Sequence, residues 1–414
     1  MLAAVPLSSY ALTDWQSSYD GVLSYLSGSS PSFGSVNGEW RVFALARGGR
    51  ISPNGNYCSN YYSGIEEYVA SIGSNVLDPN KATDNSRLVI ALTSIGRNAR
   101  NVAGYDLIEP LTDQSFVKRQ GPSGAAFALL AIASNPEYGE DNTKSAYVDF
   151  LLNAELSGGG WSLGTVADPD VTAIVITALA PYSRADSAVQ RGIGKLSELQ
   201  SENGGYLTYG SETAESCAQV VAALSTVGID CDTDERFIKN GNSVLSALCA
   251  YYTGSGFAHM PGGQVNGMAS EQAAYALCAY SRMKSGRNTL YDMRNVSPYV
   301  EPTPEPTAAP TPTAVPTPVP TPEPTVEPTA EPTAEPIAEP TEAVTDEPEA
   351  TSSPEPTEAP VTEEPVKTEE PTPIPTETPG PEETGKKNLN WLYFAVPAVL
   401  IAAVSIILIV RRKR

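Results

Sequence analysis

The 414-residue sequence contains a single histidine, His259, and only five cysteines. A Ser/His/Asp triad could therefore exist only once. The Gly-Cys-Gly-Glu-Gln motif of thioester proteins is absent. Because an odd number of cysteines at irregular spacing is not typical of a disulfide framework, we predict none, and one bridge from Cys58 stays open.

Basic residues are scarce, since 26 Lys and Arg stand against 48 Asp and Glu, a formal net charge of −22. Most of the imbalance lies in residues 297–385, which contain 20 acidic residues, one lysine and 25 of the 36 prolines. Such a segment buries too little apolar surface to fold, and as polyproline II it would reach about 260 Å. We therefore predict an acidic, disordered stalk. Residues 1–296 carry about −9, which argues against a nucleic-acid partner.

The uncharged run at 391–410, WLYFAVPAVLIAAVSIILIV, matches the thickness of a bilayer core, and the basic tail RRKR follows at 411–414. Since basic residues stay on the cytoplasmic side, we predict a single-pass protein of the cell membrane with its N-terminal domain outside. Residues 1–13 would be the remnant of a secretion signal, although they lack a basic start and a full apolar core. A tail-anchored protein facing the cytoplasm is the alternative, but it would place RRKR outside.

Between the stalk and the apolar run, Pro381–Gly385 (PEETG) resembles a Gram-positive sortase sorting signal, Leu-Pro-x-Thr-Gly. Only Thr384 and Gly385 match the pattern, because Pro381 and Glu382 stand in the places of leucine and proline. The resemblance implies attachment to the cell wall as an alternative to simple membrane anchoring.

Within residues 14–296, almost wholly apolar runs recur at 40–46, 87–96, 125–133, 171–180, 217–228 and 272–280. Such runs are typical of helices that are buried on all sides. Each is preceded by a segment with one apolar face, which is typical of a surface helix, at 15–26, 61–72, 102–111, 147–156, 187–200 and 236–252. No stretch alternates like a convincing strand. We predict an all-α domain, a single (α/α)6 toroid of six helix hairpins, because the polar capping repeats of an open solenoid are missing.

Two glycine-containing turns share one spacing. In LSELQSENGGY, Gln200 lies six residues before Tyr206, and in AELSGGGW the same interval separates Glu155 from Trp161. YYTGSGF, which ends at Phe257, is a weaker third copy. These turns resemble the QW repeat of squalene and terpene cyclases.

Residues 14–293 therefore resemble the terpene cyclase/protein prenyltransferase α/α toroid, and in particular the prenyltransferase/squalene-oxidase repeat proteins of Gram-positive cell surfaces. The resemblance implies the fold but no single function, because this toroid also serves complement thioester domains, cobalamin carriers and polysaccharide lyases.

The segment DPDVTA at 168–173 resembles the Asp-x-Asp-Asp-Thr-Ala motif of class II cyclases, whose middle aspartic acid protonates the substrate. The resemblance implies Asp170 as a proton donor, but Val171 replaces the acid that would hold it protonated and stabilise its anion. A structural interpretation is that Pro169 suits a first helical turn, while Asp168 and Asp170 satisfy N-terminal amides and the helix dipole. Contact with a ligand is the third interpretation.

Acidic residues also open the other apolar runs, where each favours the helix dipole. In a closed ring, these N-termini would meet at one mouth. We therefore expect the candidate ligand-binding residues there, namely Glu39, Trp40, Asp84, Asp168, Asp170, Tyr206, Tyr209, Glu212, Glu215, Gln219 and Glu271. Acids and aromatics together suit a sugar, an amino group or a divalent cation.

Protein prenyltransferases hold zinc with an Asp-x-Cys pair and a later histidine, and Glu215, Cys217 and His259 imitate this set in part. The acid is a glutamate, and His259 lies in a turn before its helix. We therefore predict no metal and no cofactor, and interpret Cys217 as a small buried residue.

A long stalk holds a domain away from the membrane, which favours contact with a glycan, a wall polymer or a small polar ligand. We predict a membrane-anchored cell-surface protein that presents a ligand-binding or adhesion domain. The alternative is a terpene cyclase/prenyltransferase-like enzyme that acts on an isoprenoid or another small ligand in the ring cavity. An apolar cavity lined by aromatics would favour the isoprenoid, and a wet cavity ringed by acids would favour the polar ligand.

Overall fold

The computed structural model describes residues 14–208 and 210–300. Several predicted segments lie outside the described residues. They are residues 1–13, Tyr209, residues 301–385 of the predicted stalk with Pro381–Gly385, the apolar run at 391–410 and the tail at 411–414. Among the described residues, no helix is both long and apolar enough to cross a membrane.

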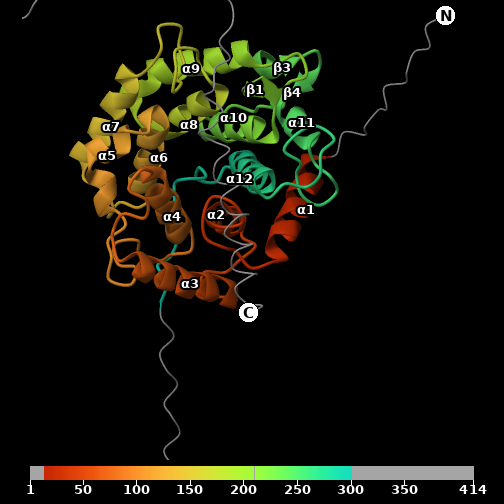
Figure 1. The fold of residues 1–414 in the computed structure, drawn as a ribbon. Coiled ribbons are helices and arrows are strands. Elements are labelled where there is room, and N and C mark those ends of the chain that lie inside the picture. Colours follow the sequence, from red (N-terminus) through yellow and green to blue (C-terminus); the bar gives the residue numbers. More distant parts are fainter. Residues whose placement is uncertain (1–13, 209, 301–414) are drawn as a thin grey trace, which may run out of the picture. The chain divides into compact units, whose positions relative to one another are not determined.

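Six helices coincide with the six apolar runs and pack side by side: α2 (Glu39–Arg47), α4 (Ala82–Ser94), α6 (Gly121–Ala133), α8 (Pro169–Leu179), α10 (Ala214–Thr226) and α12 (Gly267–Lys284). Each packs against the next along the chain, and α12 returns to pack against α2, which closes a ring (Figure 1). In α8, every residue from Val171 to Leu179 is buried, as expected for an inner helix. The prediction of an all-α domain is confirmed.

Outer helices surround the ring and bury one face each: α1 (Trp15–Ser27), α3 (Asn56–Ile72), α5 (Gln114–Lys118), α7 (Asp141–Asn153), α9 (Asp186–Leu199) and α11 (Val244–Cys249). Short 3-10 helices accompany them: η1 (Glu109–Thr112), η2 (Ser183–Ala185) and η3 (Glu235–Phe237). In α9, Val189, Ile193 and Leu196 are buried, as their spacing on one helical face predicts. Figure 1 shows this outer layer around the inner helices.

Two outer segments differ from the prediction of one continuous surface helix. In 102–111, Ala103 and Gly104 have φ angles of 52° and 88°, and the resulting turn pairs Val102 with Tyr105. A right-handed helix cannot pass through such positive φ values, so this segment supplies only the start of η1, and α5 follows it.

The segment 236–252 is also mostly not helical. Asn240 and Gly241, with φ of 50° and 81°, form the turn of a hairpin between β3 (Ile238–Lys239) and β4 (Asn242–Ser243), and only α11 continues as helix. A second hairpin joins β1 (Leu207–Thr208) to β2 (Ser211–Glu212), with Leu207 opposite Glu212. The expectation that no stretch forms strands is therefore wrong at these two places, where short loops need pairing for their backbone polar groups.

The inner helices run in the same direction, so their N-terminal ends gather at one end of the ring, which we call the mouth. Glu39 at the start of α2 lies 3.0 Å from Arg87 in α4. The amide of Thr83, near the start of α4, donates to the Oε1 of Gln120, just before α6, at 3.0 Å. Contacts between helix starts thus link neighbouring inner helices around the mouth.

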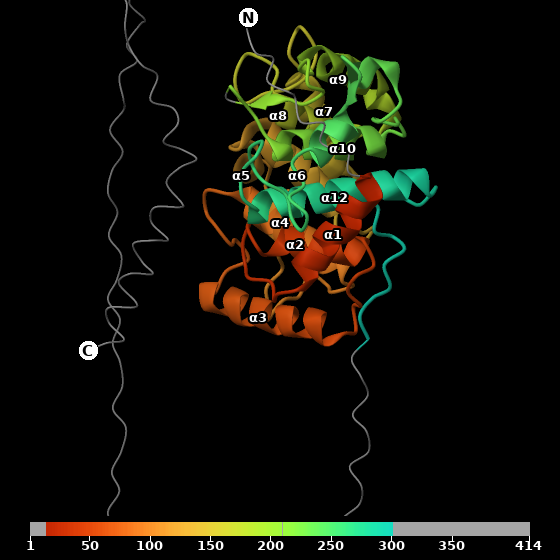
Figure 2. The ribbon, with the colours of Figure 1, turned by 90° about the vertical axis from the view of Figure 1, so that its right-hand side faces the viewer.

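The C-terminal ends gather at the opposite end, which we call the base. Arg47, the last residue of α2, donates from Nε to the carbonyl of Leu290, beyond α12, at 2.8 Å. The amide of Tyr299 donates to the carbonyl of Gly96, just beyond α4, at 2.8 Å. The described chain therefore ends at the base, away from the mouth, and Figure 2 shows this last segment passing along that side.

Aromatic rings fill the middle of the ring of inner helices. The ring centroid of Trp40 lies 5.7 Å from that of Phe127 and 5.6 Å from that of Tyr275. Phe43 lies 5.1 Å from Tyr291, which reaches the centre from the segment after α12. Burial of each aromatic side chain stabilises the fold by about 1.5–3 kcal/mol. This cluster therefore contributes much of the apolar packing that holds the inner helices together.

Candidate functional site

Asp168 begins α8 as its N-cap. Its backbone is extended, with φ −108° and ψ 133°, and its Oδ1 accepts a hydrogen bond from the amide of Val171 at 2.9 Å. Pro169 occupies the first helical turn, where its missing N–H costs nothing. The structural interpretation of this motif is confirmed for Asp168.

Asp170 does not share that role. Its Oδ1 is buried and has no hydrogen-bond partner among the described residues. Burial, with Asp168 and then Glu215 nearby, raises the pKa of Asp170 to about 7, against the opposing effect of the Ser216 and Thr208 hydroxyls. The expectation that Asp170 satisfies a helix amide is therefore wrong for Oδ1, whereas its place in the first turn of α8 agrees with the expected interaction with the helix dipole.

The hydroxyl groups of Ser216 and Thr208 lie beside Asp170, and that of Thr213 is linked to them. The Oγ of Ser216 lies 2.8 Å from the Oγ1 of Thr208 and 2.9 Å from the Oγ1 of Thr213. Thr213 is also the N-cap of α10 and accepts from the amide of Ser216 at 3.2 Å. The β1–β2 hairpin thus brings Thr208 to the first turn of α10, and hydroxyl hydrogens can be shared between the chain and a bound ligand.

Glu215, in the first turn of α10, meets the one histidine of the chain. Its Oε2 lies 2.8 Å from the Nδ1 of His259, whose side chain is 51% exposed. The amide of Ala214 donates to the carbonyl of His259 at 3.1 Å, and Ala258 pairs with Val265. These backbone bonds fix the turn that carries His259 against the start of α10, so the turn before α12 forms a wall of the mouth.

The acids on the opposite side of the mouth already have cationic partners. Glu39 lies 3.0 Å from the Nε of Arg87, and Asp84 lies 3.0 Å from its Nη1. Glu271 lies 3.3 Å from the Nε of Arg41 and is fully buried. Burial nevertheless raises the pKa of Glu271 to about 8 and also raises that of Glu39. These pairs are part of the packing between α2, α4 and α12.

The expected ring of equivalent carboxylates is therefore wrong. In the described part of the chain, no lysine or arginine forms a salt bridge with Asp168, Asp170 or Glu215. Because these three lack a lysine or arginine partner there, we call Asp168, Asp170 and Glu215 the unpaired acids, although Glu215 contacts the His259 ring. They lie at the starts of α8 and α10, so the negative charge of the mouth is concentrated at that side.

The remaining candidates divide between the mouth and the core. Gln219 donates to the Oη of Tyr275 at 2.7 Å and to Gln272 at 3.2 Å, across α10 and α12. Trp40 is buried in the central aromatic cluster. Glu212 accepts from the Oγ of Ser201 at 2.5 Å and so fixes the β1–β2 hairpin. Of these, Gln219 lies on the same helix as Glu215.

The turns that resemble QW repeats hold the fold together. Gln200 donates from Nε2 to the carbonyls of Gly204 and Phe237, both at 2.9 Å, and pairs with the buried Tyr206. The indole N–H of Trp161 donates to the carbonyl of Leu151 at 2.7 Å, at the end of α7. Tyr206 itself is fully buried, so it belongs to the core and not to the mouth.

The partial zinc set does not assemble. Glu215 and His259 are in contact, but the buried thiol of Cys217 lies beneath Gly205 and Tyr206, on another side of α10. Burial raises the pKa of Cys217 to about 12, which disfavours the thiolate that binds metal. Within residues 14–208 and 210–300, no three His, Cys, Asp or Glu side chains come together as a metal site.

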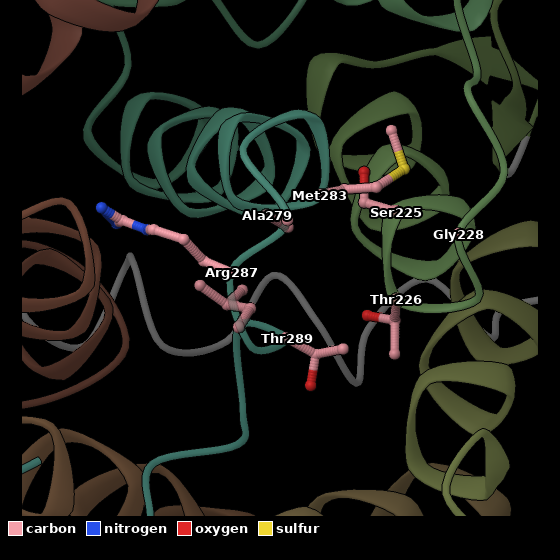
Figure 3. Close-up of a pocket in the computed structure, with 9 residues that line it drawn as sticks. Ser225, Thr226, Gly228, Ala279, Met283, Arg287 and Thr289 are labelled. Atoms are coloured by element: carbon pink, nitrogen blue, oxygen red, sulfur yellow. The ribbon is translucent and has the colours of Figure 1, made fainter. Parts of the chain in front are cut away.

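Two hollows that the sequence did not predict lie at the base. One, of about 240 Å³, lies between the ends of α10 and α12, and Figure 3 shows Ser225, Thr226 and Met283 around it. The other, of about 630 Å³, is lined by residues at and beyond the C-terminal ends of α2 and α12, among them Arg282. Arg282 and Arg47 donate to backbone carbonyls, so these cations complete helix ends.

Comparison with known proteins gives no match: no family model fits the chain, and no curated protein sequence is significantly similar to it.

Proposed function

We propose that residues 14–296 form a single (α/α)6 toroid that binds a polar ligand at its mouth, with the unpaired acids as the binding groups. The buried Oδ1 of Asp170 carries this proposal, because it lacks a hydrogen-bond partner among the described residues. A buried acceptor without a partner costs about 1–3 kcal/mol, and a ligand that donates a hydrogen bond there would remove that cost.

The chemistry of the mouth favours a ligand with several hydrogen-bond donors. Carboxylates accept only, and the hydroxyls of Thr208 and Ser216 can also accept. An amine supplies such donors, and so does a sugar with several hydroxyl groups. A glycan, a wall polymer or a small polar ligand therefore fits this site better than a hydrocarbon.

We further propose that the acidic stalk and the apolar run at 391–410 present this domain outside the cell, anchored in the membrane or, alternatively, attached to the wall through Pro381–Gly385. The path of the described chain supports presentation, because Tyr299 packs at the base beside Gly96. A tether that begins at the base leaves the mouth free to meet a partner.

An enzyme related to cyclases and prenyltransferases is the second candidate. The raised pKa of Asp170 favours it, since about half of such a group is protonated at neutral pH. However, Val171 next to Asp170 supplies no second acid. The side chains of Trp40, Phe127 and Tyr275 pack against one another in the middle of the ring of helices, where an isoprenoid substrate would have to bind. Binding is therefore the function that the geometry supports best.

A screen of the full chain in lipid nanodiscs tests both candidates. The probes are a glycan array, amine-bearing peptides and polyprenyl phosphates, each applied to wild type and Asp170→Asn. The matched control is Glu67→Gln, because Glu67 is an exposed acid on the outer helix α3. We expect a polar probe whose binding is lost in Asp170→Asn and kept in Glu67→Gln. Turnover of a polyprenyl phosphate that disappears in Asp170→Asn would establish the enzyme instead.

A further inference from the structure

Exposed aliphatic side chains gather around the unpaired acids. Five of the large hydrophobic residues that remain exposed in the described domain lie in the segments leading into α8, α10 and α12: Leu163 (58%), Val166 (76%), Leu207 (53%), Met260 (40%) and Val265 (36%). We call these five residues the aliphatic rim. Single exposed hydrophobics are ordinary, but a group that lies at one end of a molecule is typical of a binding surface.

Each residue of the aliphatic rim is either close to one of the unpaired acids in the sequence or in contact with a segment that contacts one. Val166 lies two residues before Asp168, and Leu163 lies over Gly121 at the start of α6. Leu207 precedes Thr208, whose hydroxyl contacts Ser216.

The other two residues come from the turn before α12. Met260 follows His259, the partner of Glu215. Val265 pairs with Ala258, on the other side of His259. The rim therefore follows the mouth from α6 to α12, and Figure 2 shows these loops together at the end of the domain opposite its exit segment.

The composition of the rim and the charge within it select the partner. Asp168, Asp170 and Glu215 have no lysine or arginine partner in the described residues and favour a cation, whereas Arg41 and Arg87 already pair with Glu39, Asp84 and Glu271. All five residues of the rim are aliphatic, whereas the exposed Phe33 lies in the loop before α2 and stacks on Tyr68. Aliphatic surface around a charged centre suits a basic side chain whose neighbours are also aliphatic, since methylene stems bury against such surface while the cation reaches the acids.

We propose that the mouth binds a polypeptide segment that carries basic side chains between aliphatic residues, with the cation at Asp170 and Glu215 and the aliphatic residues on the rim. The inference rests on the proposed function, because it names the ligand class of the same site. An exposed, extended basic segment of another protein is the partner that this chemistry recognises.

Fluorescent peptides and the full chain in nanodiscs provide the test. The probes are an acetylated decapeptide of alternating leucine and lysine, the same peptide with every lysine acetylated, and a version with serine for leucine. The acidic stalk will attract basic peptides on its own, so binding is measured in 150 mM salt and the comparison is between variants with identical stalks.

We expect Asp170→Asn/Glu215→Gln to weaken binding of the leucine–lysine peptide at least 10-fold, and Leu163→Ser/Val166→Ser to weaken it about 3- to 10-fold. Glu67→Gln should leave binding unchanged, and the acetylated and serine peptides should bind weakly to wild type. Leu163 and Val166 are exposed, so their replacement leaves the core intact. Circular dichroism melts confirm that each variant is folded.

Two results would overturn the inference. Equal affinity of wild type and both double variants would show that the peptide binds elsewhere, such as on the stalk. A glycan that binds through Asp170 and is not displaced by the peptide would leave the binding function standing and remove only the peptide partner. If Asp170→Asn weakens the binding of no probe, the proposed function fails together with this inference.

Discussion

Asp168 and Asp170 lie two residues apart at the start of α8 but have opposite surroundings. Asp168 accepts a hydrogen bond from the amide of Val171 at 2.9 Å, whereas the buried Oδ1 of Asp170 has no partner among the described residues. Asp168 therefore stabilises the helix, whereas Asp170 keeps an unsatisfied acceptor whose cost a proton or a ligand would relieve. The following predictions begin with this difference.

Asp170→Asn should stabilise the protein at pH 8 and have little effect at pH 4. The folded-state pKa of Asp170 is raised from 3.8 to about 7, so the folded state keeps a proton that the unfolded state releases. Stability therefore falls as pH rises from about 4 to about 7, and the full shift would correspond to about 4 kcal/mol. Because the residue is partly exposed, we expect a gain of about 1–2 kcal/mol in the free energy of unfolding at pH 8. Urea denaturation at both pH values measures it, and an equal loss at both would contradict the assignment.

Asp168→Ala should destabilise the protein by about 0.5–2 kcal/mol at neutral pH, because α8 loses the side-chain acceptor of its N-cap. Asp168→Ser is the matched control, since serine is also a favoured N-cap and should restore most of the loss. Thermal melts of the two variants make the comparison. Identical melting temperatures for alanine and serine would mean that the cap contributes nothing.

Arg87→Met should destabilise the protein by about 3–5 kcal/mol, because it leaves the buried Glu39 without its cation and Asp84 without its ion pair. Adding Glu39→Gln removes the stranded charge and should recover a large part of that loss. A double-mutant cycle by urea denaturation gives the coupling energy of Arg87 with Glu39. Additive losses would show that the two side chains do not interact.

Protease added to intact cells should release the domain of residues 14–296 by cutting within residues 297–385. The reason is that RRKR at 411–414 is expected in the cytoplasm, which places the stalk outside. Immunoblotting of the medium with an antibody against the domain detects the fragment. A domain that is degraded only after lysis would reverse the orientation.

The six inner helices could be predicted from the sequence because each is a long run of apolar residues, and such a run must be buried on all sides wherever it lies in the fold. The N-cap at Asp168 was equally local, since an aspartate before Pro169 begins a helix by its own chemistry. The hairpin after Phe237 also has a local signal, the pair Asn240–Gly241, which favours a two-residue turn and was missed when 236–252 was predicted as a helix.

The division of the acids at the mouth was decided only by tertiary structure. Arg41 and Arg87 are single cations inside apolar runs, and the sequence cannot tell which acid on a neighbouring helix each of them meets. The contact between Glu215 and His259 joins residues 44 positions apart and depends on how the turn before α12 packs on α10. Helix formation follows from the order of neighbouring side chains in the sequence. Charge pairing and burial instead depend on which helices pack against one another in the ring, because they vary with the distances between segments that are remote in the chain.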